Sequence, residues 1–395
     1  MFQKLFVLAT IALAAVNAHP GSHKIMNVAA ETIPAATFTF SEKFPEPGSI
    51  PTPKPEWLEL IKNVNITKAP VYKVAPGQSP QPEVAGQDPY CDWTFTGCFG
   101  KDDLYQCPKD QWALTFDDGP SEFSPKLYDY LDKENIKVTF FMVGGQVTKF
   151  PDYVLRAYKA GHEIAMHTYS HNYMTSLTNE QIVAELKWNE LAIKEVTGVS
   201  PRFFRPPYGD IDNRVRDVAA ALGFVPIIWN YDTNDWAAQS NPATYKQEWI
   251  DGNVTQWANN AKTAKVGGIS LEHDLYSSTV DAAIRVIPIL KKAYTLTPAG
   301  ACNNVQVYKE GTVPASNSTT NATVSAVSSS MVASSSIPVS SVVVAAATTT
   351  VAPAAASTSA GIAANIAGST SDASSLAGTS AFALGIAAIA AIALH

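Results

Sequence analysis

The stretch ALTFDDGP, residues 113–120, joins a short apolar run to two adjacent acids, Asp117 and Asp118, and ends at Gly119-Pro120. An apolar run of this length is typical of a buried strand, and Gly-Pro stops it in a turn. Two carboxylates side by side repel each other unless other groups neutralise them. The other motifs of the chain offer candidates for those groups.

Residues 111–297 repeat this arrangement, because short apolar runs alternate there with amphipathic stretches. The runs predict strands at 112–116, 138–143, 163–167, 202–205, 225–230 and 268–273, and the amphipathic stretches predict helices at 124–136, 151–161, 178–198, 212–223 and 279–294. Strands separated by helices pair in parallel. We expect an α/β fold in the form of a distorted, incomplete (β/α) barrel. A doubly wound open sheet is the alternative, but the polar clusters gather at strand ends, as in a barrel.

One such cluster could hold a metal ion. Asp117 and Asp118 end the first strand, and His167 and His171 lie in HTYSH at the end of the third. Two histidines at this spacing arise easily by chance. Together with a strand-end carboxylate, however, they form a ligand set that suits Zn²⁺ and leaves positions open for water and substrate.

Three further motifs follow later strands. Arg205 in RPPYG lies among apolar residues and needs an anionic partner, for which a strand-end carboxylate is the natural candidate, unless it is an ordinary surface arginine. The loop DTNDW, residues 232–236, offers Asp232, Asp235 and Trp236, although an exposed turn with a buried Trp would look the same. His273 in SLEHD could be a surface residue, or a general acid kept charged by a nearby carboxylate.

The two ends of the chain have a different composition from its middle. Residues 1–18 have the apolar run and small residues of a secretory signal peptide. Residues 303–372 are rich in Ser, Thr, Ala and Val and predict an O-glycosylated stalk, and residues 373–395 predict a GPI attachment signal that is removed, with Gly368 as the attachment residue. A weakly apolar tail is the alternative. Residues 19–106 form a proline-rich extension, which leaves residues 107–302 as the domain that contains the predicted strands and helices.

Charge and cysteine content limit the possible partners and the compartment. The net charge of −7 argues against a nucleic-acid surface. Four cysteines in a secreted chain predict two disulfides, with three possible pairings. The positions of Cys107 before the first core strand and Cys302 after the last core helix favour Cys107–Cys302, which leaves Cys91–Cys98. We expect a monomer. N-glycosylation sequons occur at Asn65, Asn253, Asn317 and Asn321.

The motifs TFDDGP, HTYSH, RPPYG, DTNDW and LEH, in this order, resemble those of the polysaccharide deacetylases, carbohydrate esterase family 4, with their NodB-type homology domain. The resemblance covers roughly half of the 395 residues. It implies the barrel of that family and hydrolysis of N-acetyl groups in chitin, which gives chitosan and acetate. The secretion signal, stalk and anchor resemble those of fungal GPI-anchored chitin deacetylases, held at the outer face of the plasma membrane or in the cell wall.

The resemblance also implies roles for the residues around a metal ion. Asp118, His167 and His171 would bind Zn²⁺, or Co²⁺ as the alternative. Asp117 would be the base that takes a proton from the attacking water. Arg205 would pair with Asp117 and hold its orientation.

The same resemblance assigns the acid and the substrate contacts. His273 would protonate the departing amine, assisted by Asp235. The backbone N–H of Tyr208 would stabilise the oxyanion together with the metal. Trp236 and Leu271 would enclose the methyl group of the acetyl.

Other readings of the sequence remain open. Within the same family, the substrate could be acetylated xylan or peptidoglycan, although a eukaryotic type of anchor makes a bacterial wall substrate a poor match. A different class of function is also open, in which the chain is a wall protein that binds chitin without hydrolysing it. The set of acids and histidines argues against a pure binder, because binding needs neither a base nor a separate acid.

Overall fold

A computed structural model of the chain describes residues 38–75 and 77–311. Contacts between residues divide the chain into two units at Lys43. In the described part of the first unit, residues 38–43, the rings of Phe38 and Phe40 lie 4.8 Å apart. The second unit begins at Phe44 and contains the helices and strands named below.

Several predicted features lie outside the described residues. They are the signal peptide 1–18, the anchor signal 373–395, Gly368, and the sequons at Asn317 and Asn321. Within residues 38–75 and 77–311, no helix combines the length and the apolar character that crossing a membrane requires.

Parallel strands form the centre of the second unit. Their order is β5-β4-β3-β2-β1-β7-β6, and β8 pairs with the start of β1. In the described part of the chain the two end strands, β5 and β6, do not pair with each other, so the barrel is incomplete, as expected. The strands are β1 Gln111–Asp117, β2 Thr139–Met142, β3 Glu163–Met166, β4 Phe203–Phe204, β5 Val225–Pro226, β6 Tyr231–Asp232, β7 Gly268–His273 and β8 Thr295–Leu296.

Side chains alternate between the two faces of these strands, and one face forms an internal core. Ala113, Phe141, Ala165, Phe203 and Ile269 belong to one buried cluster, although they come from five different strands. Successive strand residues point to opposite faces, so the residue two positions further along each strand shares this face. The internal core therefore lies directly beneath the strand ends where the polar motifs begin.

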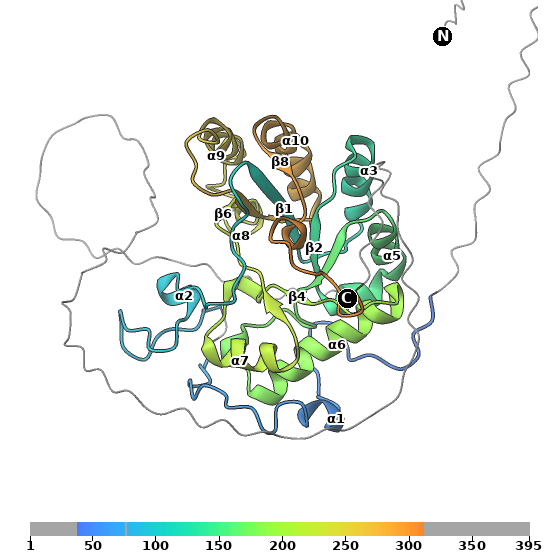
Figure 1. Cartoon of the computed structure of the whole chain (residues 1–395), viewed down its shortest axis with the longest axis vertical. Coiled ribbons are helices and arrows are strands. Elements are labelled where there is room, and N and C mark those ends of the chain that lie inside the picture. The colour runs from blue at the N-terminus through green and yellow to red at the C-terminus, as the bar shows by residue number, and fades with distance from the viewer. Residues whose placement is uncertain (1–37, 76, 312–395) are drawn as a thin grey trace, which may run out of the picture. The chain divides into compact units, whose positions relative to one another are not determined.

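Helices surround the strands (Figure 1), and each contacts the next in the order α9, α10, α3, α5, α6, α7. The predicted helices are present, and α6 has well-defined ends. Thr178 and Gln181 form a capping box at its start, and Gly198 adopts a left-handed conformation at its end. The helices are α1 Pro55–Leu58, α2 Trp93–Thr96, α3 Ser124–Glu134, α4 Gly144–Lys149, α5 Pro151–Lys159, α6 Asn179–Thr197, α7 Asn213–Ala221, α8 Ala237–Ser240, α9 Glu248–Asn259, α10 Ser277–Ala293 and α11 Ala299–Cys302, with 3₁₀ turns η1 Met174–Ser176 and η2 Pro207–Gly209.

The structure differs from the sequence prediction around residues 225–230. The predicted strand there is interrupted after Pro226, and β6 begins only at Tyr231. The N–H of Ile228 donates to the carbonyl of Leu104, and Ile227 bridges to the same residue. The segment between β5 and β6 therefore pairs with the N-terminal extension, which periodicity alone could not reveal.

The folded unit extends beyond both predicted boundaries of the domain at 107–302. The composition predicts a stalk from residue 303 onward, but Val307 and Tyr308 belong to the internal core, and the N–H of Arg202 donates to the carbonyl of Val307 at 2.8 Å. The extension also packs on the helices, because the indole N–H of Trp188 donates to the carbonyl of Thr52 at 2.8 Å. Apolar side chains and backbone pairing hold both segments on the barrel.

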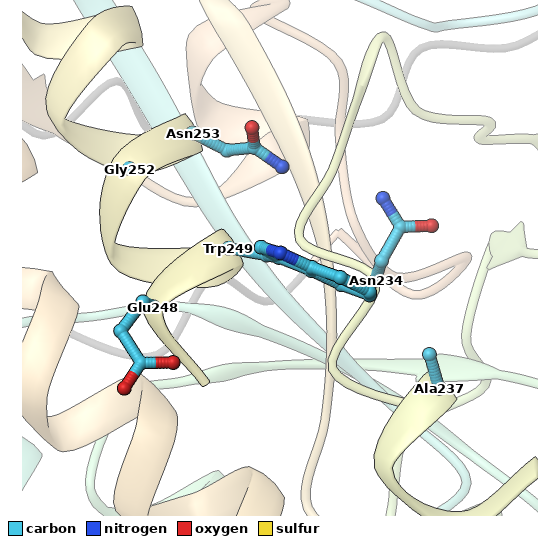
Figure 2. Close-up of a pocket in the computed structure, with 6 residues that line it drawn as sticks. All are labelled: Asn234, Ala237, Glu248, Trp249, Gly252 and Asn253. Atoms are coloured by element: carbon cyan, nitrogen blue, oxygen red, sulfur yellow. The ribbon is translucent and has the colours of Figure 1, made fainter. Parts of the chain in front are cut away.

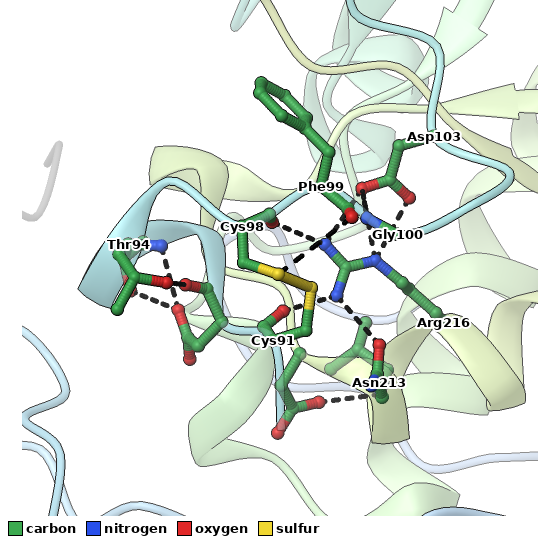
Figure 3. A network of polar contacts seen from close by, with 12 residues as sticks. Cys91, Thr94, Cys98, Phe99, Gly100, Asp103, Asn213 and Arg216 are labelled. Carbon is green, nitrogen blue, oxygen red and sulfur yellow. Dashed lines mark hydrogen bonds and ion pairs between the residues drawn. A yellow bond between two sulfur atoms is a disulfide. The ribbon is translucent and has the colours of Figure 1, made fainter. Parts of the chain in front are cut away.

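Arg216 on α7 connects the extension to the barrel (Figure 3). Its guanidinium pairs with the carboxylate of Asp103 at 2.8 Å and also donates to the backbone carbonyls of Cys91 and Cys98. These two cysteines form one disulfide, and Cys107 and Cys302 form the other. This is the pairing that the sequence favours. The longer disulfide joins the segment before β1 to α11, at opposite ends of the barrel sequence.

Candidate active site

Polar side chains gather where the strands of the barrel end. Asp117 ends β1 and His273 ends β7, and the two are partners in the parallel register. His167 directly follows β3, and Arg205 directly follows β4. The carboxyl ends of parallel strands meet at one edge. The structure therefore brings together residues that lie up to 156 positions apart.

Asp118, His167 and His171 form a possible metal site. Their ligand atoms lie within 4.8 Å of one another, and Nε2 of His171 lies 3.1 Å from Oδ1 of Asp118. This Oδ1 is buried and makes no hydrogen bond within the described chain. Nδ1 of His167 donates to the carbonyl oxygen of Arg205 at 2.8 Å, since that oxygen can only accept, and this leaves Nε2 unprotonated. One carboxylate and two imidazoles suit a divalent transition metal, so the residues fit such an ion.

The electrostatics of these ligands favour the forms that bind metals. Burial alone would raise the pKa of Asp118, but His171, His273 and His167 lower it below its usual range. Burial lowers the pKa of His167 well below its ordinary value. At neutral pH Asp118 is thus an anion and His167 a neutral imidazole, as metal ligation requires.

Asp117 is held by a fully buried arginine. Nη1 of Arg205 donates to Oδ1 of Asp117 at 2.7 Å and to the hydroxyl of Thr115 at 2.7 Å, and its guanidinium lies over the ring of Phe141. The other carboxylate oxygen of Asp117 lies 3.7 Å from Nε2 of His167. Burial raises the pKa of Asp117 to about 6, although Arg205 opposes this shift. Asp117 can therefore accept a proton near neutral pH.

His273 is paired with Asp235 on the other side of β1. Nδ1 of His273 lies 2.7 Å from Oδ1 of Asp235, and the backbone N–H of His273 donates to Oδ2 at 2.9 Å. Burial lowers the pKa of His273, but Asp235 outweighs it and raises the pKa to about 10. The imidazole is then positively charged at neutral pH and can donate a proton.

The loops that carry these residues adopt unusual backbone conformations. Asp118, Thr168, His171, Tyr208 and Asn234 all have positive φ values, between 56° and 74°. Such values are uncommon outside glycine and are costly for a β-branched residue such as Thr168. Strained backbone of this kind concentrates at functional sites. The surrounding contacts must hold it in place.

Two buried polar residues of α6, which belong to none of the sequence motifs, provide such contacts. The carboxylate of Glu185 accepts hydrogen bonds from the backbone N–H groups of Tyr169 and Ser170, both at 2.8 Å. The amide of Asn189 donates to the carbonyl of Thr168 at 2.6 Å. Both residues lie one helical turn apart on the buried face of α6. In the sequence, the only sign of this role is that two polar residues fall on the otherwise apolar face of the helix.

The other predicted site residues lie on the same elements. The ring of Tyr208 lies 4.8 Å from that of His171, so Tyr208 borders the metal ligands. Trp236 directly follows Asp235, and Leu271 lies two residues before His273 on β7. The pocket for the acetyl methyl that these last two residues would form stays a prediction.

Two predicted sequons fall in described parts of the chain. Asn65 is exposed in the extension, and the Thr67 hydroxyl of the same sequon donates to Asp217 at 2.7 Å. Asn253 is half-buried on α9. Of the two, Asn65 is therefore the more accessible to modification.

Comparison with known proteins identifies relatives of this chain. Residues 105–227 match the family model described as polysaccharide deacetylase. Chitin deacetylase 1 of Cryptococcus neoformans var. grubii is 39% identical over 287 residues, which cover 69% of this chain and 60% of that protein. Chitin deacetylase 1 of Saccharomyces cerevisiae is 33% identical over 252 residues, which cover 60% of this chain and 79% of that protein.

The chain is also similar to a solved structure, that of the chitin deacetylase from the fungal pathogen Colletotrichum lindemuthianum. The two are 28% identical, the match covers 52% of this chain and 95% of that one, and the TM-score is 0.47. The chain spans about 60% of the length of the Cryptococcus relatives. With 33% identity over 79% of the Saccharomyces protein, the chain belongs to the polysaccharide deacetylase family.

Proposed function

We propose that this chain is a metal-dependent chitin deacetylase, which hydrolyses the N-acetyl groups of N-acetylglucosamine units and yields chitosan and acetate. The observation that carries this proposal is the metal-ligand set of Asp118, His167 and His171 beside a carboxylate base and a charged imidazole. The Cryptococcus and Saccharomyces relatives are named as chitin deacetylases, which supports chitin as the substrate.

On one side of the acetyl group, Asp117 acts as the base. A bound Zn²⁺ or Co²⁺ would supply Lewis acidity toward water and the acetyl carbonyl. Asp117 takes a proton from the attacking water, and its raised pKa makes it a better proton acceptor than an ordinary aspartate. The ion pair at 2.7 Å to Arg205 fixes one carboxylate oxygen and leaves the other directed toward the metal ligands.

On the other side, His273 acts as the acid. An amine leaves slowly unless it is protonated, and the charged imidazole of His273 can supply this proton. Asp235 keeps the imidazole charged and fixes its orientation through Nδ1, so Nε2 is the donating atom. The backbone N–H of Tyr208 stabilises the oxyanion, and Trp236 and Leu271 enclose the acetyl methyl.

The remaining segments suit a protein of the fungal cell surface. We assign residues 1–18 to a signal peptide, residues 312–372 to the stalk, and residues 373–395 to a GPI signal removed at Gly368. The catalytic domain acts as a monomer, and Asn65, Asn317 and Asn321 carry N-glycans. We therefore expect the enzyme to act beside chitin in the wall.

Acetate release from N-acetylglucosamine oligomers tests the proposal. We expect a chelator to abolish release and added Zn²⁺ to restore it. Asp117→Asn should reduce release about 10²- to 10⁴-fold, because the variant cannot accept the proton. Asp102→Asn, an exposed acid that pairs only with its neighbour Lys101 in the described chain, is the matched control and should keep full activity.

Metal content provides a readout that does not depend on activity. His171→Ala should lower the metal bound per chain, measured by mass spectrometry of the purified protein, whereas Asp102→Asn should not. Release of acetate from acetylated xylan but from no chitin oligomer would make the chain an esterase. Absence of release from either substrate would refute the enzymatic proposal altogether.

A further inference from the structure

Helix α2 of the extension lies against the turn η2, which carries Tyr208. The N–H of Trp93, the first residue of α2, donates to the carbonyl of Ile211 at 3.1 Å, and the N–H of Asn213 donates to the carbonyl of Tyr90 at 2.9 Å. Both bonds reach the segment that follows η2. The extension is therefore tied by its backbone to the segment beside the proposed oxyanion donor.

The turn has a backbone conformation that needs support. Tyr208 and Gly209 have φ values of 62° and 74°, so two successive residues are left-handed. The N–H groups of Gly209 and Asp210 donate to the carbonyls of Pro206 and Pro207, both at 3.0 Å. A left-handed residue with a Cβ is uncommon and persists where its surroundings hold it. The direction of the Tyr208 N–H depends on this conformation, so whatever fixes the turn also fixes that N–H.

Trp93 closes one side of the turn. A Cβ on Gly209 would overlap the indole of Trp93 and would lie 3.1 Å from Trp229, so only glycine lets these rings approach so closely. The two indoles pack edge to face, with their centroids 4.7 Å apart. Trp229 in turn lies beside Arg205, whose guanidinium carbon is 5.5 Å from the ring centroid. Trp93 thus contacts the turn directly, and one further ring connects it to the arginine that holds Asp117.

Not every tryptophan near the strand ends blocks a neighbour in this way. Figure 2 shows the indole of Trp249 extending from α9 toward the loop that carries Asn234, and this indole borders a cavity of about 460 Å³. Trp249 is 50% exposed. In contrast, the space between Trp93 and Gly209 could not hold a single additional methyl group. Movement of the turn toward α2 is therefore blocked by the ring.

Helix α2 is itself fixed to the barrel (Figure 3). The carboxylate of Asp92 caps it by accepting a hydrogen bond from the N–H of Thr94 at 2.8 Å. The disulfide Cys91–Cys98 encloses the helix, and Arg216 donates to the backbone carbonyls of both cysteines. A helix of one turn that is closed by a disulfide and bound by an arginine can hold an indole in one position.

We propose that Trp93 is a positioning residue of the reaction centre. Its ring fixes the turn Pro207–Gly209 and so directs the backbone N–H of Tyr208 toward the oxyanion. This inference rests on the proposed function, because the oxyanion forms only in that reaction. An oxyanion donor stabilises the transition state more than the bound substrate, so loss of the ring lowers kcat and leaves KM nearly unchanged. The extension is then part of the catalytic unit and not only an attachment.

Kinetics of acetate release from N-acetylglucosamine oligomers test this role. Trp93→Ala should lower kcat about 10- to 100-fold, somewhat less than the complete loss of an oxyanion donor, and should change KM less than about 2-fold. Trp93→Phe keeps an aromatic ring against Gly209 and should restore kcat to within about 3-fold of the unmodified chain.

Trp57→Ala is the matched control. Trp57 is another tryptophan of the extension, and it packs edge to face on Trp188 of α6, with centroids 5.1 Å apart, and not on the turn. The control removes the same kind of contact between the extension and the barrel, so kcat should stay unchanged. A loss of kcat in Trp57→Ala equal to that in Trp93→Ala would mean that any loosening of the extension slows the reaction, and would overturn the inference.

Trp93→Leu provides a second variant should Trp93→Ala fail to fold. Leucine keeps an apolar side chain between α2 and the turn but lacks the flat ring over Gly209, so kcat should fall about 3- to 10-fold. Full kcat in Trp93→Leu would show that the turn does not need the ring, and the positioning role would be refuted.

Hydrogen exchange, followed by mass spectrometry in the peptide 206–213, reports on the turn without acetate release. Trp93→Ala should speed exchange there about 10-fold or more, and Trp57→Ala should not. Faster exchange with an unchanged kcat would make Trp93 a structural residue only, which contradicts the inference while the proposed function stands. If the unmodified chain releases no acetate, the proposed function is refuted, and unchanged exchange in Trp93→Ala refutes the positioning role by itself.

Discussion

His162 makes the stability of the fold sensitive to acid. Its side chain is 0% exposed, Nδ1 accepts a hydrogen bond from the N–H of Val138 at 3.3 Å, and Nε2 makes no hydrogen bond within the described chain. The rings of Phe140 and Tyr128 lie 5.2 Å and 6.4 Å away. Burial in this setting lowers the pKa of His162 from 6.5 to about 3, with a smaller contribution from Lys137.

The direction of the effect follows from proton binding. The unfolded chain binds a proton at His162 below about pH 6.5, whereas the folded chain does so only near pH 3. The stabilising contribution of the neutral imidazole is therefore complete above pH 6.5 and is lost as the pH falls toward 3. At 1.36 kcal/mol per pH unit, the folded state loses about 2 kcal/mol between pH 6.5 and 5.0.

Urea denaturation at pH 7.5 and 5.0 measures this loss by comparison with His162→Asn. The variant keeps an acceptor near the position of Nδ1 but cannot be protonated. Buried carboxyls elsewhere titrate equally in the unmodified protein and in the variant. The difference between the free energies of unfolding of these two proteins therefore reports the protonation of His162 alone. We expect this difference to shift by about 2 kcal/mol in favour of the variant at pH 5.0.

A matched core substitution controls for general effects of acid. Ile164→Val removes a methyl group from a buried residue nearby on β3, and its effect on stability should be the same at both pH values. If His162→Asn behaves in the same way, with no dependence on pH, then the imidazole is not neutral in the fold and the reasoning is wrong.

The two disulfides should contribute unequally to stability. In the chain-entropy model, a disulfide stabilises the fold more when it closes a longer loop. Cys107–Cys302 closes a loop of 195 residues and should contribute about 5 kcal/mol, whereas Cys91–Cys98 closes one of 7 residues and should contribute about 2 kcal/mol. Urea denaturation of the paired Cys→Ala variants should show this order, and equal losses would contradict it. Asp235→Asn should move the alkaline limb of acetate release to lower pH by at least about one unit, because it removes the carboxylate that raises the pKa of the proposed acid. An unmoved limb in the pH profile would show that another group sets it.

Much of the barrel and the positions of its polar ends could be predicted because both depend on local sequence. The apolar run before Asp117 predicted a strand, and the parallel topology then placed the ends of β1 and β7 side by side. The need of a buried arginine for an anion predicted a carboxylate partner for Arg205, which the structure places 2.7 Å from Asp117. These inferences required only periodicity, chain direction and charge.

Other parts of the site depend on contacts between distant segments, which no local pattern encodes. Glu185 and Asn189 lie in a regular amphipathic helix, and only the tertiary fold shows that they hold the loop of Thr168. Thr168 has a left-handed conformation, which a β-branched residue disfavours, and the hydrogen bond from Asn189 to its carbonyl helps to hold it there. The two-residue strand β8 is too short for a periodic signal.

The attachment of the extension determines the order in which the protein can fold. Thr67 hydrogen-bonds to Asp217, which lies 150 residues further along the chain, and Thr52 hydrogen-bonds to Trp188, which lies 136 residues further along. During synthesis the extension emerges before any of these partners exist. The extension is thus made before its partners but docks only after them, and until then the faces of α6 and α7 that it covers are exposed.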